Sequence, residues 1–339
     1  MIRSFAVVLL LMVATGAALV LTDNVPDAIT PEPEDTRPIN PLTGLRAETL
    51  PNRVVQFSID NVDCIPQSGL SKADIIYEMP AEGGLTRLQA IFYGETPDVV
   101  GPIRSARPYF IDVAREYGAI FVHHGGSQEG VAYLKTGVVD HISPDNISSI
   151  FWRSKTRYAP HNSMLNYADL WEVIRDRSID VAQEVRTFTF APEVKEDNNK
   201  DTEDGEEPVV PTVTAVTVDN PYTLVEYKYI QETNLYEHYV DGELYIDAEN
   251  DLPITASNIL IQYVKSSPIY YGGKTLRIDL TAGGKALLFT GGNVVEGTWS
   301  RADLDSPTMF TDIEGKEFVL TRGKTWVHVI DHNSEVTYK

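Results

Sequence analysis

Apolar runs and helical stripes alternate along the first half of the chain. Four segments are rich in Ile, Val, Phe and Tyr, as is typical of β-strands: residues 53–60, 73–79, 88–94 and 119–125. A helix is predicted over 107–118, because its apolar residues recur at i, i+3, i+4 and i+7 and Gly118 stands at its end. The same stripe returns over 167–179. Residues 39–190 are therefore predicted to form an α/β domain with a mixed, partly parallel sheet and helices.

From about residue 211 the pattern changes to short alternating segments rich in β-branched and aromatic residues. Helical stripes are absent from this half. The pairs Asp241-Gly242 and Gly291-Gly292 lie between such segments, as hairpin turns do. Residues 211–339 are predicted to form a predominantly antiparallel β domain.

Two polar segments divide the chain. Residues 23–38 are rich in proline and acidic residues, which predicts an extended, solvated tether. Residues 191–210 carry a dense acidic run with almost no apolar side chains, which indicates a linker or solvated loop. A length of 339 residues fits two domains, since single domains have about 100–200 residues.

The first 22 residues resemble an export segment. Arg3 precedes an uncharged run from Phe5 to Leu21 that consists mostly of Ala, Val and Leu. This is the pattern of a positive region followed by an apolar region. Removal by cleavage and retention as a membrane anchor both remain open. Either outcome places the body of the protein outside the cytoplasm, secreted or membrane-anchored, and an uncleaved segment would make the membrane a partner.

Charge and cysteine content exclude several classes of function. The net charge is −21, so nucleic acid and anionic lipid surfaces are poor partners. Cys64 is the single cysteine, which rules out an internal disulfide and a cysteine-based metal site within one chain. No cysteine follows the export segment directly, so lipid modification at that point is not expected.

Several motifs together resemble the YerB-like family of bacterial envelope lipoproteins. In the first half they are "NPLTGL", "PQSGLSKADIIYEM", "EGGLTRLQAIF", "VGPIRSARPYF", "AIFVHHGGS" and "FWRSKTRYAPHN". In the second half they are "NLYEHYVDGELYID", "SNILIQY", "GTWSR" and "RGKTWVHVI". The resemblance covers roughly residues 39–331 and implies an N-terminal and a C-terminal domain of unknown function on a membrane-attached protein. It implies no reaction.

The segment "AIFVHHGGSQEG", residues 119–130, carries the first group of candidate site residues. If 119–122 is a buried strand, its carboxyl end presents a polar cluster, which is where ligands bind in α/β sheets. Ser127 suits the N-cap of a short following helix. We expect a ligand site here, formed by His123, His124, Gly125, Gly126 and Ser127. The alternative is a tight glycine turn in which one histidine is packed and the other solvated.

Further candidates come from "GPIRSARPYF" and "TRYAPHNSM". Pro108 fits the first helical position, so Arg104 and Arg107 lie next to a helix start that disfavours positive charge. Bound anions or carboxylates such as Glu78, Glu82 and Asp112 would each account for them. His161 and Asn162 complete the predicted cleft.

Two functional hypotheses remain open. The first is a non-catalytic binding module for a cell-wall component or an envelope protein, with an anion-friendly Arg/His cleft. The second is a hydrolase or transferase on an anionic or saccharide envelope substrate, with His123, His124 or His161 as acid or base and arginines as clamps. No Gly-x-Ser-x-Gly, Walker or His-Glu-x-x-His motif occurs, so neither a cofactor nor a metal is expected.

Overall fold

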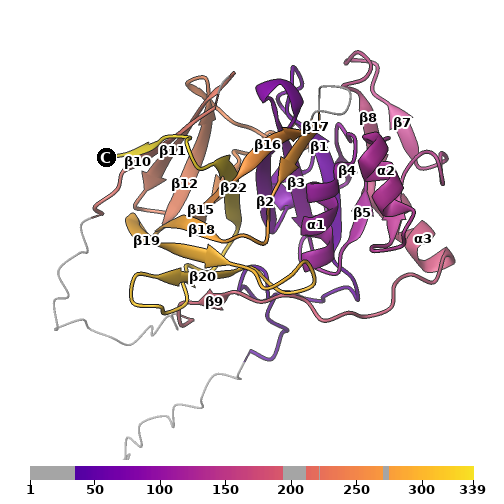
Figure 1. Cartoon of the computed structure of the whole chain (residues 1–339). Coiled ribbons are helices and arrows are strands. Elements are labelled where there is room, and N and C mark those ends of the chain that lie inside the picture. The colour runs from indigo at the N-terminus through magenta and orange to yellow at the C-terminus, as the bar shows by residue number, and fades with distance from the viewer. Residues whose placement is uncertain (1–34, 194–210, 221, 270–274) are drawn as a thin grey trace, which may run out of the picture. The chain divides into compact units, whose positions relative to one another are not determined.

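A ten-stranded sheet contains strands from both halves of the chain (Figure 1). It is seen in a computed structural model that describes residues 35–193, 211–220, 222–269 and 275–339. The strand order is β20-β19-β18-β15-β22-β2-β3-β1-β5-β6. The first half supplies β1 (Val55–Asp60), β2 (Ile75–Pro80), β3 (Thr86–Phe92), β5 (Ile120–Val122) and β6 (His141–Ile142). The second half supplies β15 (Asn258–Val264), β18 (Gly284–Thr290), β19 (Asn293–Ser300), β20 (Met309–Asp312) and β22 (Thr325–Asp331).

The strand directions gather several carboxyl ends at one edge of this sheet. β3 is antiparallel to both β1 and β2, so these two strands run the same way. β5 is parallel to β1 and β6 is parallel to β5. On the other side β22 is parallel to β2, and β15 is parallel to β22. The carboxyl ends of all these strands therefore lie along one edge.

The predicted fold class is confirmed. The N-terminal half has the mixed, partly parallel sheet with helices, and the C-terminal half is mostly antiparallel. One pairing was not predicted from the sequence. β2 and β22 join the two halves directly, with Ile75 opposite Thr325 and Glu78 opposite His328.

A second, antiparallel sheet packs against the first. Its order is β13-β12-β11-β10-β23, with β14 paired to β12. The strands are β10 (Ala215–Asp219), β11 (Leu224–Ile230), β12 (Leu235–Val240), β13 (Glu243–Leu244), β14 (Thr255–Ala256) and β23 (Val336–Tyr338). Val216 and Tyr227 of this sheet share a buried hydrophobic cluster with Ile259 and Trp326 of the large sheet.

Three smaller pairings complete the described strands. β4 (Val99–Val100), β8 (Ser163–Asn166) and β7 (Phe151–Arg153) form one small sheet. β16 (Ser266–Ile269) pairs with β17 (Thr275–Ile278), and β9 (Thr189–Phe190) pairs with β21 (Val319–Leu320).

The helices follow the predicted stripes. α1 (Pro108–Glu116) buries Phe110, Val113 and Ala114 in a second hydrophobic cluster, on the other face of the large sheet. α2 (Gln128–Leu134) begins after Ser127, whose Oγ accepts a hydrogen bond from the Gly130 N–H at 3.0 Å, as an N-cap does. α3 (Tyr167–Asp176) buries Leu170 and Ile174. Two 3-10 turns, η1 (Leu70–Lys72) and η2 (Glu82–Gly84), lie beside β2.

Some predictions fall on residues that are not described. The export segment 1–22 and most of the tether 23–38 and the linker 191–210 lie outside the described residues, and the proposed domain boundaries stay predictions. Within the described ranges, we find no helix that is both long and apolar enough to cross a membrane.

Candidate functional site

Polar side chains gather at the edge of the large sheet where the parallel strands end. Asp60 is the last residue of β1, and Glu78 lies near the end of β2. Arg87 is the second residue of β3, which begins at this edge. His123 and His124 follow β5 directly. Ligands of open α/β sheets bind at an edge of this kind.

Asp60 organises the first group of these side chains. The residue is fully buried, and its Oδ2 lies 2.8 Å from Arg104 Nε and 2.6 Å from His161 Nδ1. The Arg104 contact is an ion pair whose angle does not suit a hydrogen bond. Asp60 Oδ1 is buried, and no residue in the described part of the chain donates a hydrogen bond to it. Two predicted site residues, Arg104 and His161, thus meet at a carboxylate that the sequence analysis did not select.

Arg107 meets a different carboxylate. It forms a two-pronged ion pair with Glu82 of η2, in which Nη2 donates to Oε2 at 2.7 Å and Nε donates to Oε1. Arg107 Nη1 also donates to the Ala106 carbonyl at 2.8 Å. The pKa of Glu82 is lowered: burial opposes the shift, but the hydrogen bond and charge of Arg107 outweigh it. Among the three carboxylates considered from the sequence, Glu82 is thus the internal partner of Arg107.

Arg87 lies between these two pairs and has no such partner. The register places it directly opposite Asp60, on the same sheet face. Only 7% of Arg87 is exposed, yet its Nε and Nη1 have no hydrogen-bond partner among the described residues. The pKa of Arg87 is lowered, first by burial and then by the charges of Arg107 and Arg104, while Asp60 and Glu82 oppose the shift. Three guanidinium groups therefore surround two carboxylates.

His124 belongs to a neighbouring network. Its Nδ1 lies 2.6 Å from Ser163 Oγ, and its Nε2 lies 3.1 Å from Arg153 Nη2. Arginine only donates, so Nε2 accepts from Arg153, and Nδ1 carries the proton that is donated to Ser163. The pKa of His124 is lowered by burial and then by the charge of Arg153. The lone pair that a general base needs is consequently occupied. Asn162 joins this network through Oδ1, which accepts from Arg153 Nη1 at 2.8 Å.

His123 is packed inside the fold. It is 2% exposed and stacks on Phe121, with ring centroids 5.3 Å apart. Nδ1 donates to the Gly125 carbonyl at 2.8 Å, and Nε2 lies 3.1 Å from His141 Nδ1. Burial lowers the pKa of His123 to about 4, so the ring is neutral at physiological pH. Its contacts are those of a structural residue.

The glycine turn packs closely against the backbone that leads to α1. The Gly125 carbonyl accepts from the Ala106 N–H at 2.9 Å, and the Ser127 N–H donates to the Ala106 carbonyl at 3.1 Å. A Cβ added at Gly126 would lie 3.0 Å from Val131 Cγ2. Close packing between two chain segments thus accounts for glycine at this position.

The predicted site residues therefore fall into three groups. Arg104, Arg107 and His161 lie around Asp60, Glu82 and Arg87, while His124 and Asn162 form the Arg153 network. His123, Gly125, Gly126 and Ser127 make internal packing and capping contacts, and the binding roles of all these residues stay predictions. Sequence reasoning did not select Asp60 for the site, whereas the motif "EGGLTR" had drawn attention to Glu82 and Arg87 without assigning them a role. The alternation of Gln56, Ser58 and Asp60 in the first strand could have indicated a polar sheet face.

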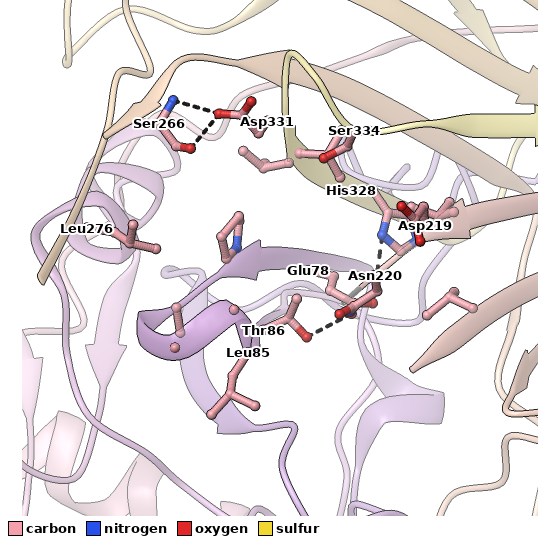
Figure 2. Close-up of a pocket in the computed structure, with 18 of the residues that line it drawn as sticks. Glu78, Leu85, Thr86, Asp219, Asn220, Ser266, Leu276, His328, Asp331 and Ser334 are labelled. Atoms are coloured by element: carbon pink, nitrogen blue, oxygen red, sulfur yellow. Dashed lines mark hydrogen bonds and ion pairs between the residues drawn. The ribbon is translucent and has the colours of Figure 1, made fainter. Parts of the chain in front are cut away.

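A cavity of about 400 Å³ opens at the same edge, at the ends of β2 and β22 (Figure 2). Glu78 lines it and is 3% exposed. Burial raises the pKa of Glu78 to about 7. A buried carboxyl that titrates near neutrality in a cavity is a common property of functional sites.

Cys64 is not poised for thiol chemistry. Cys64 is buried, and burial raises the pKa of its thiol to about 12, so the reactive thiolate is not populated. Within the described residues, no group of three or more His, Cys, Asp or Glu side chains has a metal-binding arrangement.

Comparisons with known proteins agree with the family resemblance. Two family models match, the "Protein of unknown function (DUF3048) N-terminal domain" over residues 42–180 and the corresponding C-terminal domain over residues 213–327. The "Putative lipoprotein YerB" of Bacillus subtilis (strain 168) is 35% identical over 294 residues, which is 86% of this chain and 85% of that protein. The crystal structure of YerB from Bacillus subtilis matches with a TM-score of 0.77 and 32% identity, covering 89% of this chain and 100% of that one. The chain belongs to the DUF3048 family, whose N-terminal and C-terminal models together match most of its length.

Proposed function

We propose that the protein is an extracytoplasmic binding module whose ligand presents an anionic group to Arg87, Arg104 and Arg107. The location is supported by the apolar segment after Arg3 and by the name of the Bacillus subtilis relative, a lipoprotein. The ligand is a cell-wall component or another envelope protein. The N-terminal segment, cleaved or retained, decides whether the module is secreted or tethered to the membrane.

The unpartnered guanidinium of Arg87 carries this proposal. Burying a charged group without a partner is unfavourable by several kcal/mol, so such groups are nearly always paired. Arg104 and Arg107 already have Asp60 and Glu82, and their charges add to that of Arg87. An anion bound beside Arg87 would balance the excess positive charge of the three guanidinium groups.

The guanidinium group selects the chemistry of the ligand. Its planar donors match the paired oxygens of a carboxylate or a phosphate, and such bonds are stronger than neutral hydrogen bonds. The ligand's anionic group is therefore a carboxylate or a phosphate, and titration with each anion distinguishes the two.

The contacts of His124 favour binding over catalysis. The Arg153 guanidinium occupies Nε2, and the Nδ1 proton is donated to Ser163. A neutral histidine in this state has no free lone pair with which to accept a proton from a substrate. With His124 as its acid or base, the hydrolase or transferase alternative would require this network to open first.

The test is to titrate the full chain, held in nanodiscs, with inorganic phosphate and separately with acetate. Isothermal titration calorimetry measures the binding of each anion. We expect saturable binding of one of these anions, weakened by added salt. The variant Arg87→Met should lose binding by at least about tenfold, the loss typical of a charged hydrogen bond. The control Arg175→Gln, on the exposed side of α3, should bind as the parent does.

Two results would overturn the proposal. One is the absence of binding for both anions at tens of millimolar. The other is equal affinity in the parent and Arg87→Met. Turnover of envelope fragments that disappears in a His124→Ala variant would instead support the enzyme.

A further inference from the structure

The cavity at the ends of β2 and β22 is built from segments that are far apart in the chain (Figure 2). β2 and η2 supply one wall, β10 and β11 a second, and β22 a third. Figure 2 shows Glu78, Asn220 and His328 lying together from these three segments. The volume of the cavity, about 400 Å³, falls in the range of small-molecule sites.

The charge of the cavity is opposite to that of the arginine group. Among the described residues, four acidic side chains line it, those of Glu78, Glu82, Asp219 and Asp331, and no lysine or arginine does. Glu82 is already neutralised by Arg107. His328 adds no positive charge, because burial lowers its pKa to about 3. The cavity therefore disfavours anions and favours a cation.

Glu78 has one oxygen that is saturated and one that is not. Oε1 accepts from Thr86 Oγ1 at 2.9 Å, from Asn61 Nδ2 at 3.3 Å and from Asn220 Nδ2 at 3.4 Å. Oε2 accepts no hydrogen bond of normal geometry from the described residues, and His328 Nδ1 lies 3.7 Å away, beyond hydrogen-bond distance. The Trp326 indole lies near enough to the carboxyl to lower its pKa, but its Nε1 makes no hydrogen bond of normal geometry with any described residue. Glu78 is only 3% exposed and lines the cavity. Its Oε2 is therefore placed to accept a hydrogen bond from a ligand in the cavity.

Much of the remaining wall is hydrocarbon. Val218, Val225, Leu276, Val329 and Ile330 line the cavity together with Leu85. A bare inorganic cation would gain nothing from these side chains, which supply no ligand atoms. An ammonium group attached to an alkyl chain would use both the free oxygen and the apolar walls.

We propose that this cavity binds a primary ammonium group carried on a short alkyl chain, with Glu78 Oε2 accepting from the ammonium and the apolar walls covering the chain. The cavity and the arginine group share Glu82, but the amine is assigned to Glu78 and the anion to Arg87, so either proposal can fail without the other.

The probe is 5-aminopentan-1-ol, and the matched neutral compound is pentane-1,5-diol. Both have five carbons and one hydroxyl in common, and they differ only in the ammonium group. Each compound is titrated into the full chain in nanodiscs at pH 8, and calorimetry measures its binding. We expect the amine to bind at least about tenfold more tightly than the diol, as a charged hydrogen bond predicts. The anion 5-hydroxypentanoate should not bind.

Variants separate a specific site from general attraction to an acidic protein. Glu78→Gln should lower the affinity for the amine at least about tenfold and leave that for the diol unchanged. Glu172→Gln removes an exposed carboxylate on α3 and should change neither. Leu85→Trp keeps Glu78 and fills the cavity, so it should abolish binding of both compounds even if Glu78→Gln folds poorly. Equal affinity for amine and diol, undiminished amine binding in Glu78→Gln or Leu85→Trp, or no amine binding by the parent would each overturn the proposal.

Discussion

Asp60 and Arg87 face each other across the β1–β3 pairing, yet neither side chain satisfies the other. Asp60 Oδ2 is committed to Arg104 and His161, while its Oδ1 has no hydrogen bond. Arg87 Nε and Nη1 are also without partners. A buried acid and a buried base in direct opposition normally pair. Their separation indicates that this position is not optimised for stability alone.

Replacing Arg87 by methionine should stabilise the protein without ligand. The variant removes a buried guanidinium whose hydrogen bonds are unmade and keeps an apolar chain of similar shape. We expect the free energy of unfolding in urea to rise by about 1 kcal/mol. A fall would mean that Arg87 serves the fold, for example through a water shared with Asp60 Oδ1.

Asp60→Asn should have the opposite effect. The substitution leaves Arg104 and His161 without their shared carboxylate. Breaking a fully buried ion pair is unfavourable by about 3–5 kcal/mol, but both partners here are partly solvated, so we expect about 2 kcal/mol. Urea unfolding measures this loss. As a control, Asp305→Asn breaks an exposed ion pair with Arg115 and should leave the free energy of unfolding nearly unchanged.

Glu78 should make stability depend on pH. Its pKa is about 7 in the folded protein, raised by burial from the ordinary value of 4.5, so the folded state binds more protons than the unfolded state between these values. Stability from this group is present below pH 4.5 and is lost as the pH rises through 7. The difference between the parent and Glu78→Gln in unfolding free energy should fall with pH across this window, by at most about 1.4 kcal/mol per pH unit.

Asp74 also makes the stability depend on pH in this range. Burial raises its pKa to about 6, so it contributes a slope of the same sign. Taking the difference between the parent and Glu78→Gln cancels that contribution, because Asp74 is present in both. A difference that does not vary between pH 5 and 8 would contradict the assignment to Glu78.

Ser163 should be unreactive towards serine-hydrolase reagents. Its Oγ accepts the Nδ1 proton of His124, so no base is positioned to remove the hydroxyl proton. A fluorophosphonate probe at pH 7 should not label the chain, as mass spectrometry can check. Labelling of Ser163 that disappears in His124→Ala would contradict this and favour the catalytic alternative.

Local patterns were sufficient to predict much of the fold. The apolar stripe of 107–118 became α1, Ser127 became a helix cap, and the strands over 53–60, 73–79 and 88–94 became β1, β2 and β3. Each of these features depends on residues that lie only a few positions apart in the sequence. Periodicity and capping preferences describe interactions of that range.

The candidate site depends on longer-range relations. Asp60 is opposite Arg87 only through the register of β1 and β3, and nothing in either segment specifies that register. His123 and His124 were selected together, but one packs on Phe121 and the other contacts Ser163. Arg104 and Arg107 were predicted more successfully than the histidines, since both lie near carboxylates at the start of α1. The start of a helix is a local feature that the sequence can indicate.

The pairing of β2 with β22 has a consequence for dissection of the molecule. The two matched family regions do not each close their own sheet, because Ile75 to Glu78 hydrogen-bond to Thr325 to His328. A chain cut between residues 193 and 211 would yield two fragments, each with an unpaired inner strand. Such fragments expose a template for association, so they should aggregate when expressed singly and reassemble when expressed together.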